Sequence, residues 1–184
     1  MRLVCIKTTS FEPVFASADI KKQLPNEASL FDSVDDDWRR VMATLKADET
    51  ATEATKSPSL YETLCHCHER LEIVAKELNK YLETKQLFFS RFFFLSNEDL
   101  LSILKETRDP KKVQPHLKKC FEGIKSLQFD EDNKISAMYS VENEKVDFVK
   151  IIDPAHAEGA VEKWLVGVEE DMLKSVREMI YLAW

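Results

Sequence analysis

Cysteine and histidine, the side chains best suited to bind zinc or to act as nucleophiles, gather at two places in this sequence. The run CHCH occupies 65–68, and His116 and Cys120 lie four positions apart. On helices, Cys65 and His68 share one face and His116 and Cys120 another, and two such pairs could supply a tetrahedral zinc site. The pairs are distant in sequence, however, and buried cysteine commonly acts as a small hydrophobe. We therefore expect reduced thiols and no metal. The alternative is a thiol enzyme that uses Cys65 or Cys120 as its nucleophile, but no other residues of a thiol active site can be recognised in the sequence.

Two other sequence motifs are incomplete. The acidic run at 130–134 is typical of a calcium loop, but it lacks the glycine at the sixth position, and Val141 stands where a bidentate Glu belongs. The three glycines, Gly123, Gly159 and Gly167, lie at neither the GxxxxGK[ST] nor the GxGxxG spacing that phosphate binding needs. We expect a surface turn at 130–134, and no catalytic residue or cofactor in this chain.

Five lysines recur at positions that one helical flank would bring together. If a single helix continued through Pro115, they would share one side of it, opposite an apolar side. Such a stripe is ordinarily a solvated face, but in an acidic protein it also suits docking of an acidic partner. The candidate contact residues are Lys111, Lys112, Lys118, Lys119 and Lys125.

Phenylalanine concentrates in the run FFSRFFFLSNEDLL at 88–101, which holds five of the chain's eleven Phe around one Arg. Burying one Phe contributes about 1.5–3 kcal/mol, which makes such a cluster far more valuable as core than as a stacking platform. Arg91 then needs a carboxylate, a carbonyl or an aromatic face as its partner. The predicted structural core comprises Phe89, Phe92, Phe94, Leu100, Leu104 and Trp164.

The composition is that of a globular protein. The chain has 184 residues, of which 44% are hydrophobic and 32% charged, and its net charge is −7. No apolar run approaches the roughly 18 residues that a membrane span needs. The acidic balance disfavours nucleic acid and anionic membrane as partners, because both require neutralisation of phosphate by Lys and Arg. The first residues do not form a signal peptide, so we expect a cytoplasmic location.

Hydrophobic periodicity predicts a mainly α fold, arranged as an elongated helical bundle with one small sheet. The strongest stripe starts at Leu60 and repeats with alternating 4-3 spacing to Tyr81, which predicts a helix over 59–85, roughly 40 Å long. Three β-rich runs within 126–152 predict a hairpin or three-stranded meander. Further helices are expected over 35–46, from Ser96 to about Arg108, from Asp109-Pro110 towards Gly123 with a kink or restart at Pro115, and from Val161 onward, with a surface connection over 47–59.

These elements suggest three parts. Residues 1–34 give a weak signal and are expected to be poorly defined. Residues 35–125 are expected to form a helical subdomain, and residues 126–184 the small β meander with a long C-terminal helix.

The segment FFFLSNEDLLSILKETRDPKKVQPHLKKCFEGI, residues 92–124, closely resembles the signature of the dynein heavy chain linker. The runs DDDWRRVM, LEIVAKELNKYLETKQ, ISAMYSVENEKV and VEKWLVGVEEDM resemble neighbouring parts of that region, so the resemblance covers about residues 35–178. Leu-Ser-Asn and Gln-Pro-His-Leu-Lys-Lys-Cys are more similar to the axonemal branch than to the cytoplasmic one. Ser90 and Gln86 depart from the pattern, since the family usually has Pro and a basic residue there.

The resemblance implies a function that composition does not. The dynein linker is a helical lever that lies across a ring of ATPase modules and bends as the ring cycles through ATP. We therefore expect a non-catalytic segment of a longer heavy chain, in the cytoskeleton of a cilium or flagellum axoneme. Its implied partners are the motor ring of the same heavy chain and, in the full complex, intermediate and light chains, without direct microtubule contact. The alternative is a self-contained helical adaptor that binds partners through its amphipathic helices.

Overall fold

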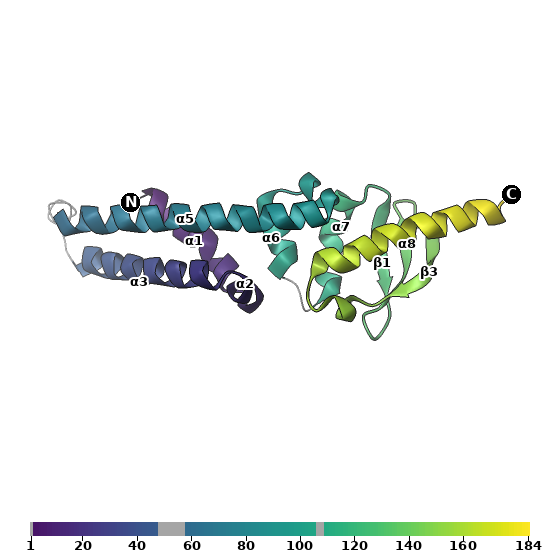
Figure 1. Cartoon of the computed structure of the whole chain (residues 1–184), viewed down its shortest axis with the longest axis horizontal. Coiled ribbons are helices and arrows are strands. Elements are labelled where there is room, and N and C mark those ends of the chain that lie inside the picture. Colours follow the sequence, from purple (N-terminus) through teal and green to yellow (C-terminus); the bar gives the residue numbers. More distant parts are fainter. Residues whose placement is uncertain (1, 48–57, 106–108) are drawn as a thin grey trace. The chain divides into compact units, whose positions relative to one another are not determined.

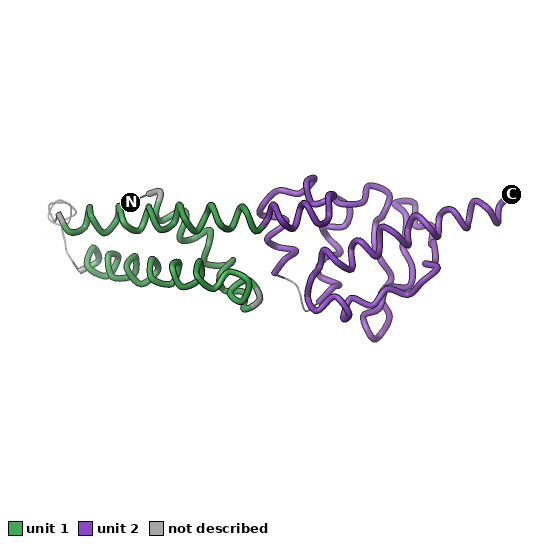
Figure 2. Tube along the Cα trace, viewed as in Figure 1, with its two compact units in different colours: residues 1–81 green, residues 82–184 purple. Residues whose placement is uncertain are grey.

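The computed structural model describes residues 2–47, 58–105 and 109–184, and it is mainly helical with one small sheet (Figure 1). Two compact units divide the chain, Met1–Tyr81 and Leu82–Trp184 (Figure 2). Their boundary falls within helix α5 (Pro58–Phe88), away from the boundary expected near residue 125. The expected surface connection over 47–59 lies largely outside the described residues. No helix in the described ranges is long and apolar enough to cross a bilayer.

The N-terminal residues form helices, so the expectation of a poorly defined segment over 1–34 is wrong. They build α1 (Arg2–Phe15), α2 (Ala18–Gln23) and the start of α3 (Pro25–Ala47). Thr8 Oγ1 donates to the carbonyl of Val4 at 2.8 Å, so a residue with weak helix propensity is satisfied within α1. The Phe15 ring stacks on Phe31 of α3 at 5.2 Å. Burial against α3 therefore outweighs the weak local signal.

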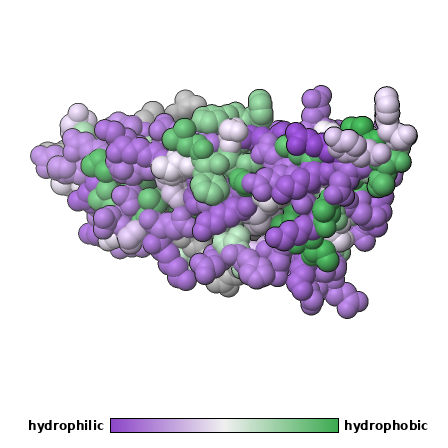
Figure 3. Space-filling view, turned by 45° about the vertical axis from the view of Figure 1, so that its right-hand side comes forward, coloured by the Kyte–Doolittle hydropathy of each residue, from purple (hydrophilic) through white to green (hydrophobic). Residues whose placement is uncertain are grey.

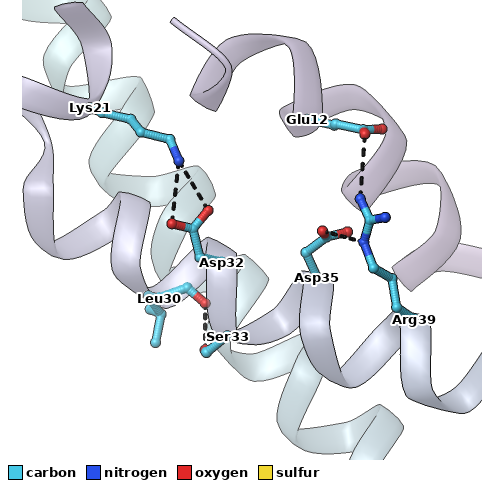
Figure 4. A network of polar contacts seen from close by, with 7 residues as sticks. All are labelled: Glu12, Lys21, Leu30, Asp32, Ser33, Asp35 and Arg39. Atoms are coloured by element: carbon cyan, nitrogen blue, oxygen red, sulfur yellow. Dashed lines mark hydrogen bonds and ion pairs between the residues drawn. The ribbon is translucent and has the colours of Figure 1, made fainter. Parts of the chain in front are cut away.

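Ion pairs also join the helices of the first unit. Lys21 of α2 donates to Asp32 of α3 at 3.2 Å, and Arg39 of α3 lies between Glu12 of α1 and Asp35 of its own helix (Figure 4). These groups are largely exposed, so their ion pairs contribute little to stability compared with the buried apolar residues of the same helices.

Helix α5 buries most of the predicted stripe, but Leu60 and Leu64 at its start are only half-buried, and its end is shifted by one residue. Cys67, Leu71, Val74 and Leu78 are all buried, but the next buried residue is Leu82 rather than Tyr81. A straight α-helix has 3.6 residues per turn, so a strict 3.5-residue repeat drifts round its surface. The drift moves the stripe on by one residue at the end of the third heptad.

The second unit contains the predicted three-stranded meander. Strands β1 (Ile124–Phe129), β2 (Ile135–Ser140) and β3 (Lys145–Ile152) are antiparallel in the order β1-β2-β3. Asn133 and Asn143, with φ of 60° and 67°, occupy the turns, where asparagine tolerates the left-handed conformation. The acidic run at 130–134 is thus the β1–β2 turn. Helix α8 (Val161–Leu182) packs against β3, and Trp164 is buried on it.

The phenylalanine run forms the short 3₁₀ helix η1 (Ser90–Phe94), and this changes which rings are buried. Phe89 and Phe92 are buried and meet edge to face at 5.0 Å, whereas Phe94 is 74% exposed. A 3₁₀ helix has three residues per turn, so Phe89, Phe92 and Leu95 point inward and Phe94 points away. The prediction of Phe94 as a core residue is therefore wrong. Helix α6 (Asn97–Lys105) buries Leu100 and Leu104, and its expected end near Arg108 lies outside the described residues.

Candidate functional site

The five candidate lysines lie on three different elements. Lys111 and Lys112 are in the 3₁₀ helix η2 (Pro110–Val113), the next two are in α7 (Gln114–Cys120), and Lys125 is in β1. Pro115 stands at the start of α7, where its missing N–H costs nothing, so the helix restarts there. The predicted restart at Pro115 is therefore confirmed, and the condition under which the five lysines would share one helical flank is not met. The apolar residues expected opposite are nevertheless all buried: Val113, Leu117, Cys120, Phe121 and Ile124.

One of these lysines is part of the fold. Lys119 Nζ donates to Asp99 of α6 at 2.6 Å, and His116 Nδ1 lies 3.8 Å from the same carboxylate. Ser96 Oγ donates to Asp99 at 3.0 Å and accepts the backbone N–H of Asp99 at 3.2 Å, which caps the start of α6. The hydrogen bond from Lys119, followed by that from Ser96, lowers the pKa of Asp99 below its usual value. Asp99 thus joins α6 to α7.

Of the other lysines, Lys125 has a hydrogen-bond partner within the fold, whereas Lys111, Lys112 and Lys118 are exposed. Lys125 Nζ donates to Asn143 Oδ1 in the β2–β3 turn at 2.7 Å. Lys111 and Lys118 are exposed, and neither forms an ion pair with any residue of the described ranges. The face of the molecule drawn in Figure 3 is mostly hydrophilic, with hydrophobic residues scattered among the hydrophilic ones. The candidate contact surface therefore reduces to Lys111 and Lys118, with Lys112 exposed beside the first.

Arg91 has all three kinds of partner that its position in an aromatic run requires. Its Nε donates to Glu169 of α8 at 2.8 Å, and an Nη donates to the carbonyl of Cys120 at 3.1 Å. Its guanidinium carbon lies 4.9 Å from the centre of the Phe121 ring. The prediction of a carboxylate, a carbonyl or an aromatic face is confirmed. One side chain thereby ties η1 to the end of α7 and to α8.

Gln114 closes the outer edge of β1. Its Nε2 donates to the carbonyl of Leu127 at 2.9 Å, and its Oε1 accepts the N–H of Leu127 at 3.0 Å. The side-chain amide therefore pairs with the strand as a neighbouring strand would. Gln114 and Asp99 both look like ordinary helix-start residues in the sequence, so their partners in other elements were missed.

Comparison with known proteins decides the family. Residues 4–183 match the family described as dynein heavy chain, N-terminal region 2. Human dynein axonemal heavy chain 12 is 51% identical over 172 residues, 94% of this chain and 6% of the relative. Human dynein axonemal heavy chain 3 is 50% identical over 171 residues (93% and 4%), and mouse dynein axonemal heavy chain 2 is 43% identical over 175 residues (92% and 4%). The chain belongs to the dynein heavy chain family.

The predicted family is thus confirmed, and these relatives carry the axonemal name that the Gln-Pro-His-Leu-Lys-Lys-Cys run suggested. The chain spans only 4–6% of their length. In this dynein heavy chain segment, the signature over 92–124 contains Asp99, Gln114, Cys120 and Phe121, and Arg91 lies directly before it. The signature therefore corresponds to a set of contacts between elements of the second unit.

Two of the four cysteines of this dynein segment, Cys67 and Cys120, are buried, whereas Cys65 is half-buried and Cys5 is exposed. Within the described ranges, no three His, Cys, Asp or Glu residues are placed to hold a metal ion. Cys67 is 1% exposed on the buried stripe of α5. Burial raises the pKa of the Cys120 thiol to about 11, against the opposing charge of Arg91. Because the thiolate is the reactive form, Cys120 is a poor nucleophile at neutral pH.

An open pocket of about 430 Å³ lies between β3 and α8. It was not foreseen from the sequence. Asp171, one of its acidic residues, is 5% exposed and accepts the backbone N–H of Lys150 at 2.9 Å, so its carboxylate is already hydrogen-bonded to the edge of β3. Basic and acidic groups line the pocket in equal number, which favours no single class of charged ligand: Lys150, His156, Lys174, Asp153, Glu170 and Asp171.

Proposed function

We propose that this chain is a non-catalytic segment of the linker of an axonemal dynein heavy chain. It acts as part of a mechanical lever in microtubule-based movement, and it binds no nucleotide itself. The observation that carries this proposal is the family match over residues 4–183, with about half of the residues identical to axonemal heavy chains. Family membership does not favour the alternative of a self-contained adaptor.

The helical build of the chain suits this role. Helices α3, α5 and α8 have 23, 31 and 22 residues, and each is hydrogen-bonded along its own axis. Packed protein interiors have low compressibility and transmit strain. Segments of this kind move as stiff pieces when one end is displaced.

The net negative charge of the chain bears on which partners we propose. The proposed partners are the motor ring of the same heavy chain and, in the full complex, intermediate and light chains in a cilium or flagellum. Lys111 and Lys118 are the residues proposed to touch an acidic surface of the ring. A net charge of −7 repels the acidic microtubule, so this segment makes no direct contact with it.

Two experiments test the proposal. Titration calorimetry of the isolated chain with Mg·ATP should give no binding heat, and a micromolar dissociation constant would contradict a non-catalytic linker.

In an axonemal heavy chain such as the 51% identical relative, the corresponding segment can be exchanged for this one. The chimera should hydrolyse ATP and drive microtubule gliding. A control that carries an unrelated helical domain of equal length should hydrolyse ATP without gliding. Equal behaviour of the two would refute the lever.

A further inference from the structure

Helix α8 is tied to the end of α5 by a buried ion pair. Lys85 Nζ donates to Glu162 Oε1 at 2.5 Å, and the two side chains are 15% and 7% exposed. Glu162 lies in the first turn of α8, where the helix dipole favours a carboxylate. Its Oε2 is buried without a hydrogen-bond partner among the described residues. Burying charges that are only partly satisfied is costly, so this pair is better explained by specificity than by stability.

A second ion pair lies two helical turns further along α8. Glu169 follows Glu162 by seven residues, about 10 Å along the same side of the helix. It accepts the hydrogen bond from Arg91, whose other contacts lie at Cys120 and Phe121. The side of α8 that carries these two carboxylates therefore meets cations from α5 and from η1.

Polar contacts also hold α8 against strand β3. Asp171 accepts the N–H of Lys150 at 2.9 Å, and Ser175 Oγ accepts the N–H of Val149 at 3.0 Å. Both α8 residues are buried, at 5% and 2% exposure. Every residue from 176 to 184 is exposed. The direction of the uncovered end of α8 is thus set entirely by contacts made at or before Ser175.

We propose that Lys85, Arg91, Glu162 and Glu169 form an electrostatic latch that fixes the position of α8. When the latch opens, α8 leaves β3 as one piece, while α6, α7 and the β1–β2 pair stay folded. Ion pairs suit such a device, because their strength depends on geometry and ionic strength, whereas apolar packing alone tolerates sliding. Glu169 and Arg91, each about 30% exposed, form the weaker half of the latch and open first.

Amide hydrogen exchange on the whole chain tests the latch, with Glu169→Ala as the main variant. Arg91 keeps its contacts with Cys120 and Phe121 in this variant, so the fold is expected to survive. Exchange should accelerate about tenfold over residues 165–175, and equally at Val149 and Lys150, whose acceptors lie on α8. Amides of β1–β2, such as Ala137, should change less than about twofold.

Glu170→Ala is the matched control, because it makes the same change one position along, at a residue whose only ion pair within the described ranges is an exposed one with Lys174 at 4.0 Å. It should leave exchange in α8 unaltered. Raising KCl to about 0.5 M should accelerate exchange in α8 of the wild-type chain and have little further effect in Glu169→Ala. The latch is refuted if Glu169→Ala and Glu170→Ala behave alike. Uniform acceleration through the whole second unit would refute it equally, since the pairs would then contribute only to global stability.

Discussion

Phe92 and Phe94 stand two positions apart in η1 and have opposite surroundings. Phe92 is fully buried against Phe89, whereas Phe94 is 74% exposed. Replacing Phe92 with Ala should lower the free energy of unfolding by about 3–5 kcal/mol, because it removes apolar contacts and leaves a cavity. Phe94→Ala should change it by less than about 0.5 kcal/mol. Urea denaturation of both variants measures the difference, and similar losses would contradict the inward and outward assignment.

The Asp99 contacts make a prediction about pH. The pKa of Asp99 is lowered in the folded state, chiefly by Lys119, so the carboxylate stabilises the fold above its unfolded pKa. This contribution is lost as the pH falls below about 4 and through the lowered value. Lys119→Gln should raise the pKa of Asp99 towards 3.8, its unperturbed value, and make stability fall less steeply over that acid range. Carboxyl NMR titration measures the pKa, and Lys118→Gln should leave it unchanged.

Single residues were predictable from the sequence where their chemistry allowed few outcomes. Arg91 in an aromatic run had to find a carboxylate, carbonyl or ring, and it found all three. Phe94 was misjudged because hydrophobicity says nothing about the local turn, and a 3₁₀ helix directs every third side chain inward. Asp99 and Gln114 were missed because a helix-start residue looks the same whether or not its side chain reaches another element.

At the scale of elements, both edges of the three-stranded sheet are closed by side chains. Gln114 pairs with Leu127 on the β1 edge, and Asp171 and Ser175 accept N–H groups on the β3 edge. Unpaired edges invite association with other chains. A sheet this small thus gains from helices that cover it with polar partners as well as with apolar surface.

Gln114→Ala should open the β1 edge. The change leaves the N–H and carbonyl of buried Leu127 without their side-chain partners, at a cost of about 1–3 kcal/mol. Gln23→Ala, at an exposed position of α2, should cost less than about 0.5 kcal/mol. Thermal denaturation compares the two variants, and light scattering before unfolding should increase only for Gln114→Ala. If both variants match the wild type, the Gln114 contacts with β1 contribute nothing.

Helices and strands followed from the sequence where hydrophobic period and turn signals agreed, as in α5, the meander and α8. They did not follow where tertiary burial opposed local preference. In α1, Thr and Ser side chains and Pro13 weaken the helical signal, yet packing against α3 decides the outcome. Pro115 illustrates the reverse case, because its effect on the backbone was foreseen, but the lysine flank was built on the less probable continuous helix.

For the whole molecule, part of the predicted lysine set is committed to internal contacts and is not available to a partner. The chain is acidic, and Lys119 and Lys125 serve internal contacts. Lys111 and Lys118 are the members of the predicted set that are exposed and form no ion pair in the described ranges. The proposed lever would have to bind and release its ring through weak, reversible contacts, and surface ion pairs of about 0.2–1 kcal/mol each would meet that requirement.

The corresponding prediction concerns an intact axonemal heavy chain that carries this segment. Lys111→Glu combined with Lys118→Glu should reduce gliding velocity and weaken its dependence on salt, because two attractive contacts become repulsive. The free energy of unfolding of the isolated chain should barely change, since neither side chain supports the fold. Lys22→Glu with Lys76→Glu reverses two other exposed charges, on α2 and α5, and should leave velocity near the wild-type value. Equal slowing by the two double variants would trace the effect to net charge. Unaltered velocity in the first would restrict Lys111 and Lys118 to keeping the segment soluble.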